Sequence, residues 1–302
     1  MVATFLRRLF FWQTLGYVAL SVGLVWLWQW SVWWLVLAGF TFPAIVLLLW
    51  TAKVTLHARP RGAGGWVWWR AIAGETWAIY RLLIGSLPWV RSAPQLSTPD
   101  TPTTQVPVLL IHGYCCNLGV WCDVVPRLRA LGHSVLAINL EPMFCSIDDY
   151  ASQVEQAVAQ LRAHTGQTRV ALVGHSMGGL VIRAWMRAHG DGQAAVVVTL
   201  GSPHQGTQIT PHAKITNARQ MVWGSDWLQA LQAGESAERR ALLRVALTAQ
   251  DAIVFPQTAQ TLPDVPTQVF EGIGHLQLCT DRAVFTWLAA QLQTANLPKV
   301  LG

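Results

Sequence analysis

Apolar and polar positions are very unevenly distributed along this chain of 302 residues. Residues 9–50 contain no Asp, Glu, Lys, Arg or His. A helix over that stretch would be about 63 Å long, roughly twice the thickness of the hydrocarbon core of a bilayer. The pattern therefore predicts two membrane-crossing helices, at residues 9–28 and 32–50, joined by a turn at residues 29–31.

Charged side chains at the two ends of this stretch predict its orientation. Arg7 and Arg8 precede the first helix, and Lys53 and Arg59 follow the second. The positive-inside rule then places both flanks, and the rest of the chain, in the cytoplasm, at a bacterial inner membrane. A secretory signal is the alternative, but the apolar run is much longer than a signal's core of roughly 7 to 15 residues, and no small-residue cleavage site follows. Residues 1–62 are thus predicted to form a transmembrane hairpin anchor.

Residues 63–105 are predicted to connect this anchor to the remainder of the chain. Residues 66–90 are apolar but carry Arg70, Glu75 and Arg81, which are too many charges for a third crossing. A helical wheel places the arginines opposite an apolar face formed by Trp68, Trp69, Ile72, Ile79 and Leu83. This face fits a helix lying in the membrane interface, and a helix packed on the following domain is the alternative. The Pro-, Ser- and Thr-rich rest of the segment is expected to be a linker.

Beyond residue 107, short β-rich runs alternate with helical stretches. Strands are predicted at 108–111, 134–138, 170–173, 195–200, 244–248 and 267–270, and helices at 120–131, 148–164, 177–189 and 281–293. The alternation predicts an α/β domain over residues 106–302 with a mostly parallel, doubly wound sheet. Residues 203–243, between two predicted strands, are long enough to cover the candidate site described below. They would do so either as an acyl-binding lid or as a cover packed only for stability.

Composition and charge narrow the functional classes. The chain is 52% apolar and only 12% charged, which fits a membrane-associated protein. Residues 1–105 hold eight Lys or Arg and two Asp or Glu, whereas residues 106–302 hold thirteen of each kind. The basic excess therefore indicates a membrane-proximal segment, and no nucleic-acid partner is expected. Phosphate-loop motifs are absent and the five cysteines lack zinc-site spacing, so no cofactor and no metal are expected.

One serine has the surroundings of a nucleophile. Gly174-His175-Ser176-Met177-Gly178 follows a predicted strand and opens a predicted helix. This is the setting of a nucleophile elbow, in which a sharp strained turn exposes the hydroxyl and glycines make room for the neighbouring strand and helix. Ser176 is therefore the candidate nucleophile, and it needs a base within hydrogen-bond reach and a group that orients the base.

Candidates for both partners follow later strands. His275 lies in a Gly-rich loop just past the last predicted strand and is the candidate base, and Asp251 follows the preceding strand directly and is the candidate acid. The order Ser, Asp, His is the order that elbow hydrolases use. Asp264, in a turn between two prolines, and Asp226 are the alternative acids.

Two backbone amides are expected to form an oxyanion hole. One belongs to Met177, the residue after the nucleophile, and the other to Tyr114, in the loop after the first predicted strand of the domain. His112 is expected to organise that loop. Cys115 and Cys116 lie beside it, but no elbow motif supports either thiol as a nucleophile.

Several of these segments together resemble the α/β-hydrolase fold, particularly bacterial lipases and esterases. The resemblance rests on residues 108–114, 174–179, 200–207, 251–256 and 274–276. It covers residues 106–293 and lacks the two leading strands of the full fold. It implies an acyl-enzyme mechanism, in which Ser176 attacks a carbonyl carbon, His275 takes the proton and Asp251 orients His275.

The sequence thus favours a membrane-anchored serine hydrolase that cleaves carboxylic esters. Its expected partners are a lipophilic ester substrate and the lipid bilayer that holds the hairpin. A catalytically silent scaffold or binding protein with the same fold is the alternative from another class. Thioesterases, amidases and acyltransferases use the same groups, and the sequence does not choose among them.

Overall fold

A seven-stranded sheet forms the centre of the computed structural model, which describes residues 1–28, 31–60, 62–91, 93–99, 104–209 and 213–295. The strands are β1 (Gln95–Ser97), β2 (Val108–Ile111), β3 (Val135–Ile138), β4 (Val170–His175), β5 (Ala194–Leu200), β6 (Leu243–Thr248) and β7 (Thr267–Phe270). Their order is β1-β3-β2-β4-β5-β6-β7, and every neighbouring pair except β1 with β3 is parallel. The predicted mostly parallel sheet is confirmed.

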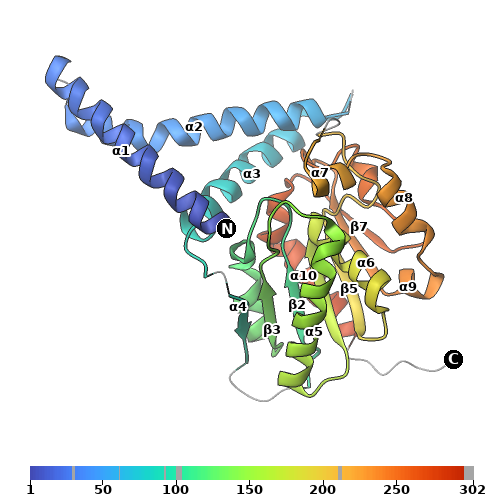
Figure 1. Ribbon diagram of the computed structural model, residues 1–302. Helices are drawn as coiled ribbons and strands as arrows, with labels where there is room; N and C mark the ends of the chain where they lie inside the picture. Colours follow the sequence, from blue (N-terminus) through green and yellow to red (C-terminus); the bar gives the residue numbers. More distant parts are fainter. Residues whose placement is uncertain (29–30, 61, 92, 100–103, 210–212, 296–302) are drawn as a thin grey trace.

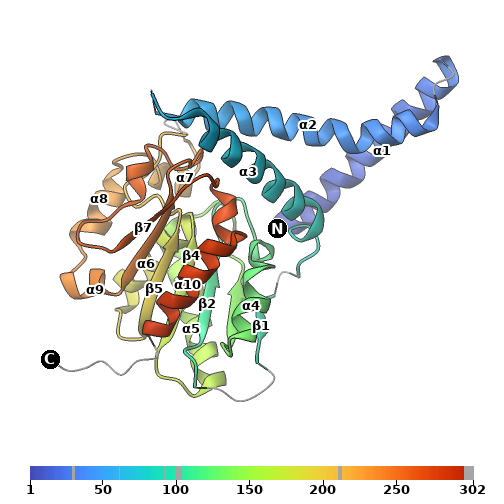
Figure 2. The same ribbon diagram turned by 180° about the vertical axis from the view of Figure 1, so that it is seen from behind.

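Helices cover both faces of this sheet. One face carries α5 (Ala151–Thr165) and α6 (Met177–His189), and the opposite face carries α4 (Val124–Ala130) and α10 (Arg282–Thr294) (Figures 1 and 2). Side chains of β2 alternate between the two cores, with Leu109 and Ile111 in one and Val108 and Leu110 in the other. Short 3-10 turns lie between these elements: η1 (Leu118–Trp121), η2 (Ile147–Tyr150), η3 (Gln257–Gln260) and η4 (Leu276–Cys279).

Strand β1 corrects the prediction that residues 91–105 are only a linker. Gln95 pairs with Ala137 and Ser97 with Val135, antiparallel to β3 at the edge of the sheet. The strand has no apolar alternation that a pattern could detect, because its side chains at positions 95 and 96 are exposed. Residues 92 and 100–103 of the predicted linker lie outside the described residues.

The predicted cap is a set of short helices between β5 and β6, namely α7 (Thr216–Gln220), α8 (Asp226–Ala233) and α9 (Ala237–Ala241). Residues 210–212 of this segment lie outside the described residues. Met221 and Leu228 are buried and join the core that α5 and α6 form with the sheet. This packing favours the alternative of a cover held in place for stability over a loose lid.

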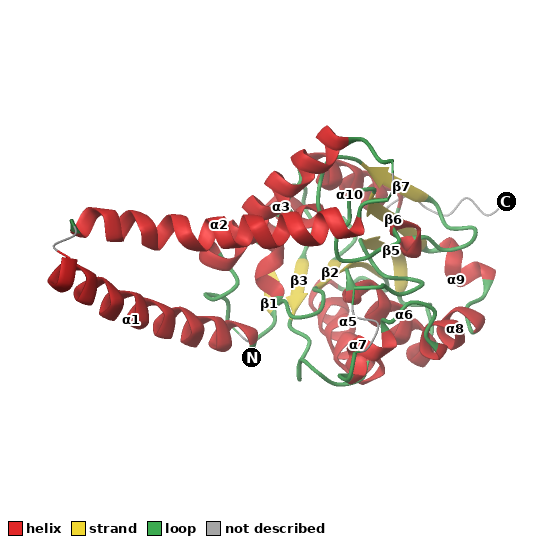
Figure 3. Cartoon of the chain, turned by 90° about the horizontal axis from the view of Figure 1, so that it is seen from above, coloured by secondary structure: helices red, strands yellow, loops and turns green. Residues whose placement is uncertain are grey.

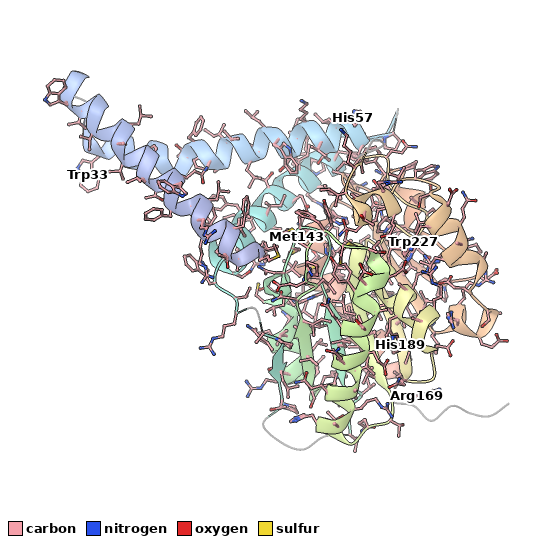
Figure 4. All side chains as sticks on the ribbon, in the orientation of Figure 1. Trp33, His57, Met143, Arg169, His189 and Trp227 are labelled. Atoms are coloured by element: carbon pink, nitrogen blue, oxygen red, sulfur yellow. The ribbon has the colours of Figure 1, made fainter. Side chains whose placement is uncertain are left out.

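Two long helices precede the α/β domain and project from it as a hairpin (Figures 1 and 3). They are α1 (Val2–Trp28) and α2 (Val32–Ala58), each longer at its domain end than predicted. Figure 4 shows Trp33 at the far tip of the hairpin and His57 at the domain end of α2. Residues 29 and 30 of the predicted turn lie outside the described residues.

The first turns of α1 and the last turn of α2, which lie at the domain end of the hairpin, both pack on the domain. Leu6 of α1 joins a core with Leu82 and Leu87, and Ala58 of α2 packs with Ala252 and Phe255. The part of the chain described here contains one helical stretch, Thr41–Ala58, that is long and apolar enough to cross a membrane by length and composition, with a mean hydropathy of 1.4. By these criteria only one of the two predicted crossings has a matching helix. The matching stretch, Thr41–Ala58, lies closer to the domain than the predicted residues 32–50.

Helix α3 (Gly65–Gly85) follows the hairpin and packs inward against α2 and η4. Trp68 and Ile72 are buried in this contact. The expectation that both face the membrane interface is therefore wrong, because protein covers this side of the helix. Trp66 and Trp77 lie outside the contact, with 79% and 64% of their surface exposed.

We expect the cap to depend on a buried ion pair. Arg183 of α6 is fully buried and binds Glu235 of the cap through two bonds, Nε to Oε1 at 2.6 Å and Nη2 to Oε2 at 2.9 Å. Arg183→Ala should lower the free energy of unfolding by about 3 to 5 kcal/mol, because the Glu235 carboxylate stays buried without a partner. Urea unfolding in detergent measures the change.

The matched control for this variant is Arg187→Ala, one turn further along α6. Arg187 pairs with Asp148 at the surface, where the two side chains are 34% and 43% exposed. Its loss should cost less than about 1 kcal/mol. Equal losses in the two variants would contradict a special role for the buried pair.

Candidate active site

The turn between β4 and α6 holds Ser176 in a strained backbone conformation. Its φ is 54° and its ψ is −125°, outside the regions that residues with a side chain normally adopt. The Ser176 amide donates to the Leu200 carbonyl at 2.8 Å, and the Gly179 amide donates to the Ser176 carbonyl at 3.1 Å. The sheet and the first turn of the helix therefore fix this turn from both sides.

Glycines flank the turn because no side chain would fit. A Cβ at Gly174 would lie 2.5 Å from the Gly179 nitrogen. A Cβ at Gly178 would collide with the backbone carbonyl of Ile111 in β2. The elbow that the motif predicts is thus present in the backbone, and both motif glycines lie at close backbone approaches.

Asp251 and His275 meet beyond the ends of β6 and β7. The His275 Nδ1 lies 2.7 Å from the Asp251 Oδ2, and both side chains are buried. The other carboxylate oxygen of Asp251 accepts from the amides of Ile253 at 2.8 Å and Val254 at 2.7 Å. These bonds leave the His275 Nε2 as the ring nitrogen available for another partner.

Competing effects act on the pKa of His275. Burial lowers the pKa by disfavouring the imidazolium, whereas the charge of Asp251, the hydrogen bond to it and the charge of Glu75 raise the pKa. The net pKa lies above the usual value for histidine. The protonated form of His275 is therefore favoured by the hydrogen-bonded Asp251 carboxylate and by the charge of Glu75.

The loops bring Ser176 and the imidazole of His275 to one edge of the sheet. A Cβ on Gly201, next to the Leu200 carbonyl that binds Ser176, would lie 3.1 Å from the His275 Nδ1. His175 bridges the two segments, since its Nε2 lies 3.2 Å from the His275 carbonyl oxygen. Among the described residues no hydrogen bond joins the Ser176 hydroxyl to the imidazole, and such bonds are often long when no substrate is bound.

The loop after β2 presents the candidate oxyanion amides. A Cβ on Gly113 would lie 2.8 Å from the Ser176 Cβ, so this loop lies against Ser176, the candidate nucleophile. The amides of Tyr114 and Met177 make no hydrogen bond within the described part of the chain. The Met177 amide also belongs to the first turn of α6, where the helix dipole favours negative charge.

His112 organises this loop rather than acting as a base. Its Nδ1 lies 2.8 Å from the Gly113 carbonyl oxygen, and its Nε2 accepts from the Leu140 amide at 3.0 Å. Burial lowers the pKa of His112 to about 4, so the ring stays neutral at physiological pH. Both nitrogens are engaged, which agrees with the expected role.

The alternative candidates are placed away from this constellation or are unsuited to it. Asp264 has a φ of 60° in an exposed turn before β7, and Asp226 is an exposed residue at the start of α8. Burial raises the pKa of the Cys115 and Cys116 thiols, that of Cys116 to about 12. Neither thiol is therefore activated as a thiolate.

Two residues that support the site escaped the sequence analysis. Glu75 of α3 accepts hydrogen bonds from the Leu276 amide at 2.9 Å and the Gln277 amide at 3.1 Å, directly after His275. Gln257 donates to the Asp251 carbonyl at 2.8 Å. The only signal for Glu75 was a single acid in an apolar stretch, which indicated no partner because the contact spans some 200 positions of the chain.

Comparison with known proteins assigns the class of this fold. Residues 106–250 match the family model described as the alpha/beta hydrolase fold. Two solved structures share the architecture, both at 15% sequence identity: the mature lipase BlEst2 of Bacillus licheniformis, with a TM-score of 0.59 over 67% of this chain and 99% of that one, and lipase B of Aspergillus fumigatus, with a TM-score of 0.57 over 66% and 56%. The chain therefore has an α/β-hydrolase fold.

Relatives in sequence carry ester-hydrolase names. The chain is 34% identical over 128 residues to a triacylglycerol lipase of Burkholderia plantarii, covering 39% of this chain and 35% of the relative. It is 35% identical over 115 residues to a triacylglycerol lipase of Pseudarthrobacter phenanthrenivorans, with 35% of each covered, and 32% identical over 128 residues to methylesterase 8 of Arabidopsis thaliana, covering 40% and 46%. The chain thus spans about a third of the length of these lipases.

We expect the elbow to be intolerant of a methyl group at position 178. Gly178→Ala should lower the free energy of unfolding by about 1 to 3 kcal/mol or more, because the added Cβ meets the rigid Ile111 carbonyl. Gly192→Ala is the control, since a Cβ there has nothing within 4 Å. Thermal unfolding in detergent compares the two, and a Gly178→Ala protein as stable as the control would contradict the close packing.

Proposed function

We propose that this protein is a serine hydrolase that cleaves carboxylic esters. The observation that carries the proposal is the buried contact between His275 and Asp251, which lies at the same sheet edge as the strained turn of Ser176. Catalytic triads need these three side chains and a donor pair for the oxyanion. The unpaired amides of Tyr114 and Met177 supply such donors in this proposal.

In the proposed reaction, the Ser176 oxygen attacks the ester carbonyl carbon while His275 Nε2 takes the hydroxyl proton. The carbonyl oxygen becomes an anion that the Tyr114 and Met177 amides stabilise. The intermediate collapses, the bond to the leaving alcohol breaks, and His275 returns its proton to the alcohol oxygen. Water then attacks the acyl-enzyme by the same route and releases the acid and free Ser176.

The named relatives support ester chemistry over other acyl transfers. The lipase and methylesterase names of the matched proteins both denote carboxylic ester hydrolysis. The aligned 128 residues cover only 35% of the first relative, so substrate choice is part of this proposal. Residues of the cap that pack on α6 would fix the shape of the acyl site rather than open it.

The N-terminal helices are proposed to anchor the enzyme in a lipid bilayer. Large apolar side chains lie on the outer surface of the hairpin, with exposures of 65% for Trp12, 77% for Trp26 and 68% for Phe42. An apolar surface of this extent marks a membrane or partner interface. The aromatic side chains of α3 add to it, and a lipophilic ester is the substrate that such an anchor would bring to the site.

The basic residues support a cytoplasmic domain. Arg7 and Arg8 of α1 and Lys53 of α2 all lie toward the domain end of the hairpin. Under the positive-inside rule this end is cytoplasmic, and the tip of the hairpin points into or across the bilayer.

Ser176→Ala should abolish ester hydrolysis. We expect kcat on p-nitrophenyl esters to fall at least about 10³-fold, because the remaining groups have no nucleophile. Ser152→Ala, an exposed serine on α5, is the matched control and should retain full activity. A fluorophosphonate probe should label the wild type and the control but not Ser176→Ala. A wild-type protein that neither turns over esters nor takes up the probe would favour a silent scaffold.

A reporter fusion tests the orientation. A reporter that is active only in the cytoplasm should be active when fused after Gly302, and one that is active only in the periplasm should be inactive there. The full chain should also stay with the membrane fraction after a carbonate wash. The same reporters inserted after Ser31, at the tip of the hairpin, should show the opposite sidedness. Periplasmic activity of the fusion after Gly302 would overturn the assignment.

A further inference from the structure

Helix α3 reaches the loop that carries His275 from outside the α/β domain. Arg70 donates from Nε to the Gly272 carbonyl at 3.1 Å, and Glu75, one and a half turns later, binds the backbone beyond His275. Figure 2 shows α3 lying across the end of the domain from which α10 starts. The helix thus holds this loop on both sides of the imidazole.

The Glu75 carboxylate is placed as a cap for the turn that His275 begins. Its Oε1 lies 2.9 Å from the Leu276 nitrogen, and its Oε2 lies 3.0 Å from the same nitrogen and 3.1 Å from that of Gln277. These are the first two amides of η4, which have no partner inside the turn itself. A Cβ on Gly274 would collide with the Glu75 side chain, so the loop closes tightly around it.

Burying this carboxylate costs free energy unless hydrogen bonds compensate for the lost water contacts. Glu75 is only 5% exposed, and burial raises its pKa to about 7 against the opposing effect of the two amides and of His275. The titratable groups that interact electrostatically with Glu75 are His275, Asp251 and Cys279. In the described part of the chain no Lys or Arg pairs with this carboxylate.

The acid side of the site receives similar support from α2. The Gln257 Nε2 that donates to the Asp251 carbonyl at 2.8 Å also donates to the Ala58 carbonyl, at 3.2 Å, at the end of the helix. The ring of His57 packs edge-on against Phe255 of the same loop. The N-terminal helices therefore contact both loops that carry the proposed acid and base.

We propose that Glu75 is a positioning residue for His275, holding the η4 turn so that the imidazole stays aligned between Asp251 and Ser176. The N-terminal segment would then complete the active site as well as anchor it. This inference rests on the proposed function for its catalytic consequence. Its structural part, the fixing of the turn by the carboxylate, stands on the contacts alone.

The test uses the full chain in detergent micelles, with a short p-nitrophenyl ester as substrate. Glu75→Ala should lower kcat about 10- to 100-fold with KM changed less than twofold, because a displaced base slows proton transfer without altering substrate contacts. Glu75→Gln keeps an acceptor oxygen for the amides and should restore kcat to within about threefold of the wild type. Arg81→Ala, which breaks the α3 ion pair with Asp123 further along the helix, is the matched control and should leave kcat unchanged.

The pH dependence of Glu75→Gln provides a second readout. A nearby negative charge raises the pKa of His275, so removing it lowers that pKa. Because the base must be neutral to act, the acid limb of the kcat/KM profile should move to lower pH in Glu75→Gln. If Glu75→Ala does not fold, Glu75→Asp takes its place: the shorter side chain should not reach the Leu276 and Gln277 amides, so kcat should fall in the same way, and an unchanged kcat overturns the proposal.

Hydrogen exchange separates this inference from the proposed function. Amides of Leu276 and Gln277 should exchange faster in Glu75→Ala than in the wild type and in Arg81→Ala, whether or not the protein turns over esters. Unchanged exchange, wild-type kcat in Glu75→Ala, or no recovery in Glu75→Gln would each overturn the positioning role. Absence of Ser176-dependent turnover in the wild type would instead overturn the proposed function, with the exchange result still deciding the role of Glu75.

Discussion

The backbone of Ser176 is the constraint on which the rest of the site depends. A residue with a side chain at a φ of 54° carries strain on the order of 1 to 3 kcal/mol, which only its surroundings can maintain. Here the bond from its amide to Leu200 ties the turn to β5, and the contact of Gly178 with Ile111 ties it to β2. The geometry of the turn thus depends on the relative positions of three neighbouring strands, β2, β4 and β5. The close-packed core therefore maintains the geometry of Ser176, the proposed nucleophile.

Asp251 and His275, the proposed acid and base, are held in a different way. Both residues lie on loops beyond the sheet, where no strand pairing fixes them. Hydrogen bonds from backbone amides to the buried Asp251 and Glu75 carboxylates fix these loops instead. Asp251 satisfies its oxygens with two amides and the imidazole, and Glu75 does the same with the two amides after His275. A buried carboxylate without such donors would be strongly destabilising, so each one specifies a single loop conformation. The proposed nucleophile is thus fixed by packing and the proposed base by hydrogen bonds.

Local patterns in the sequence predicted the parts of this arrangement that are determined locally. Short runs rich in apolar and β-branched residues identify β2 to β7, and the Gly-x-Ser-x-Gly spacing identifies the elbow, because both depend on residues that are neighbours in the sequence. Order along the chain placed Asp251 and His275 at the ends of adjacent strands, and the structure brings them within hydrogen-bond distance. Strand β1, the inward packing of Trp68 and the contact of Glu75 with Leu276 depend on distant partners. No local pattern reports such partners, so the sequence could not reveal them.

The position of the hairpin connects anchoring to the chemistry. Both of its ends pack on the domain, through Leu6 and Ala58, and the second end contacts the loop of Asp251 through Gln257. Ser176 and His275 lie at the edge of the sheet formed by the carboxyl ends of the strands. This edge therefore faces the N-terminal helices. If the hairpin lies in a bilayer as proposed, this edge is the part of the domain nearest the lipid. A lipophilic ester leaving the membrane would then reach Ser176, the proposed nucleophile, with little exposure to water, which avoids the unfavourable free energy of hydrating its apolar surface.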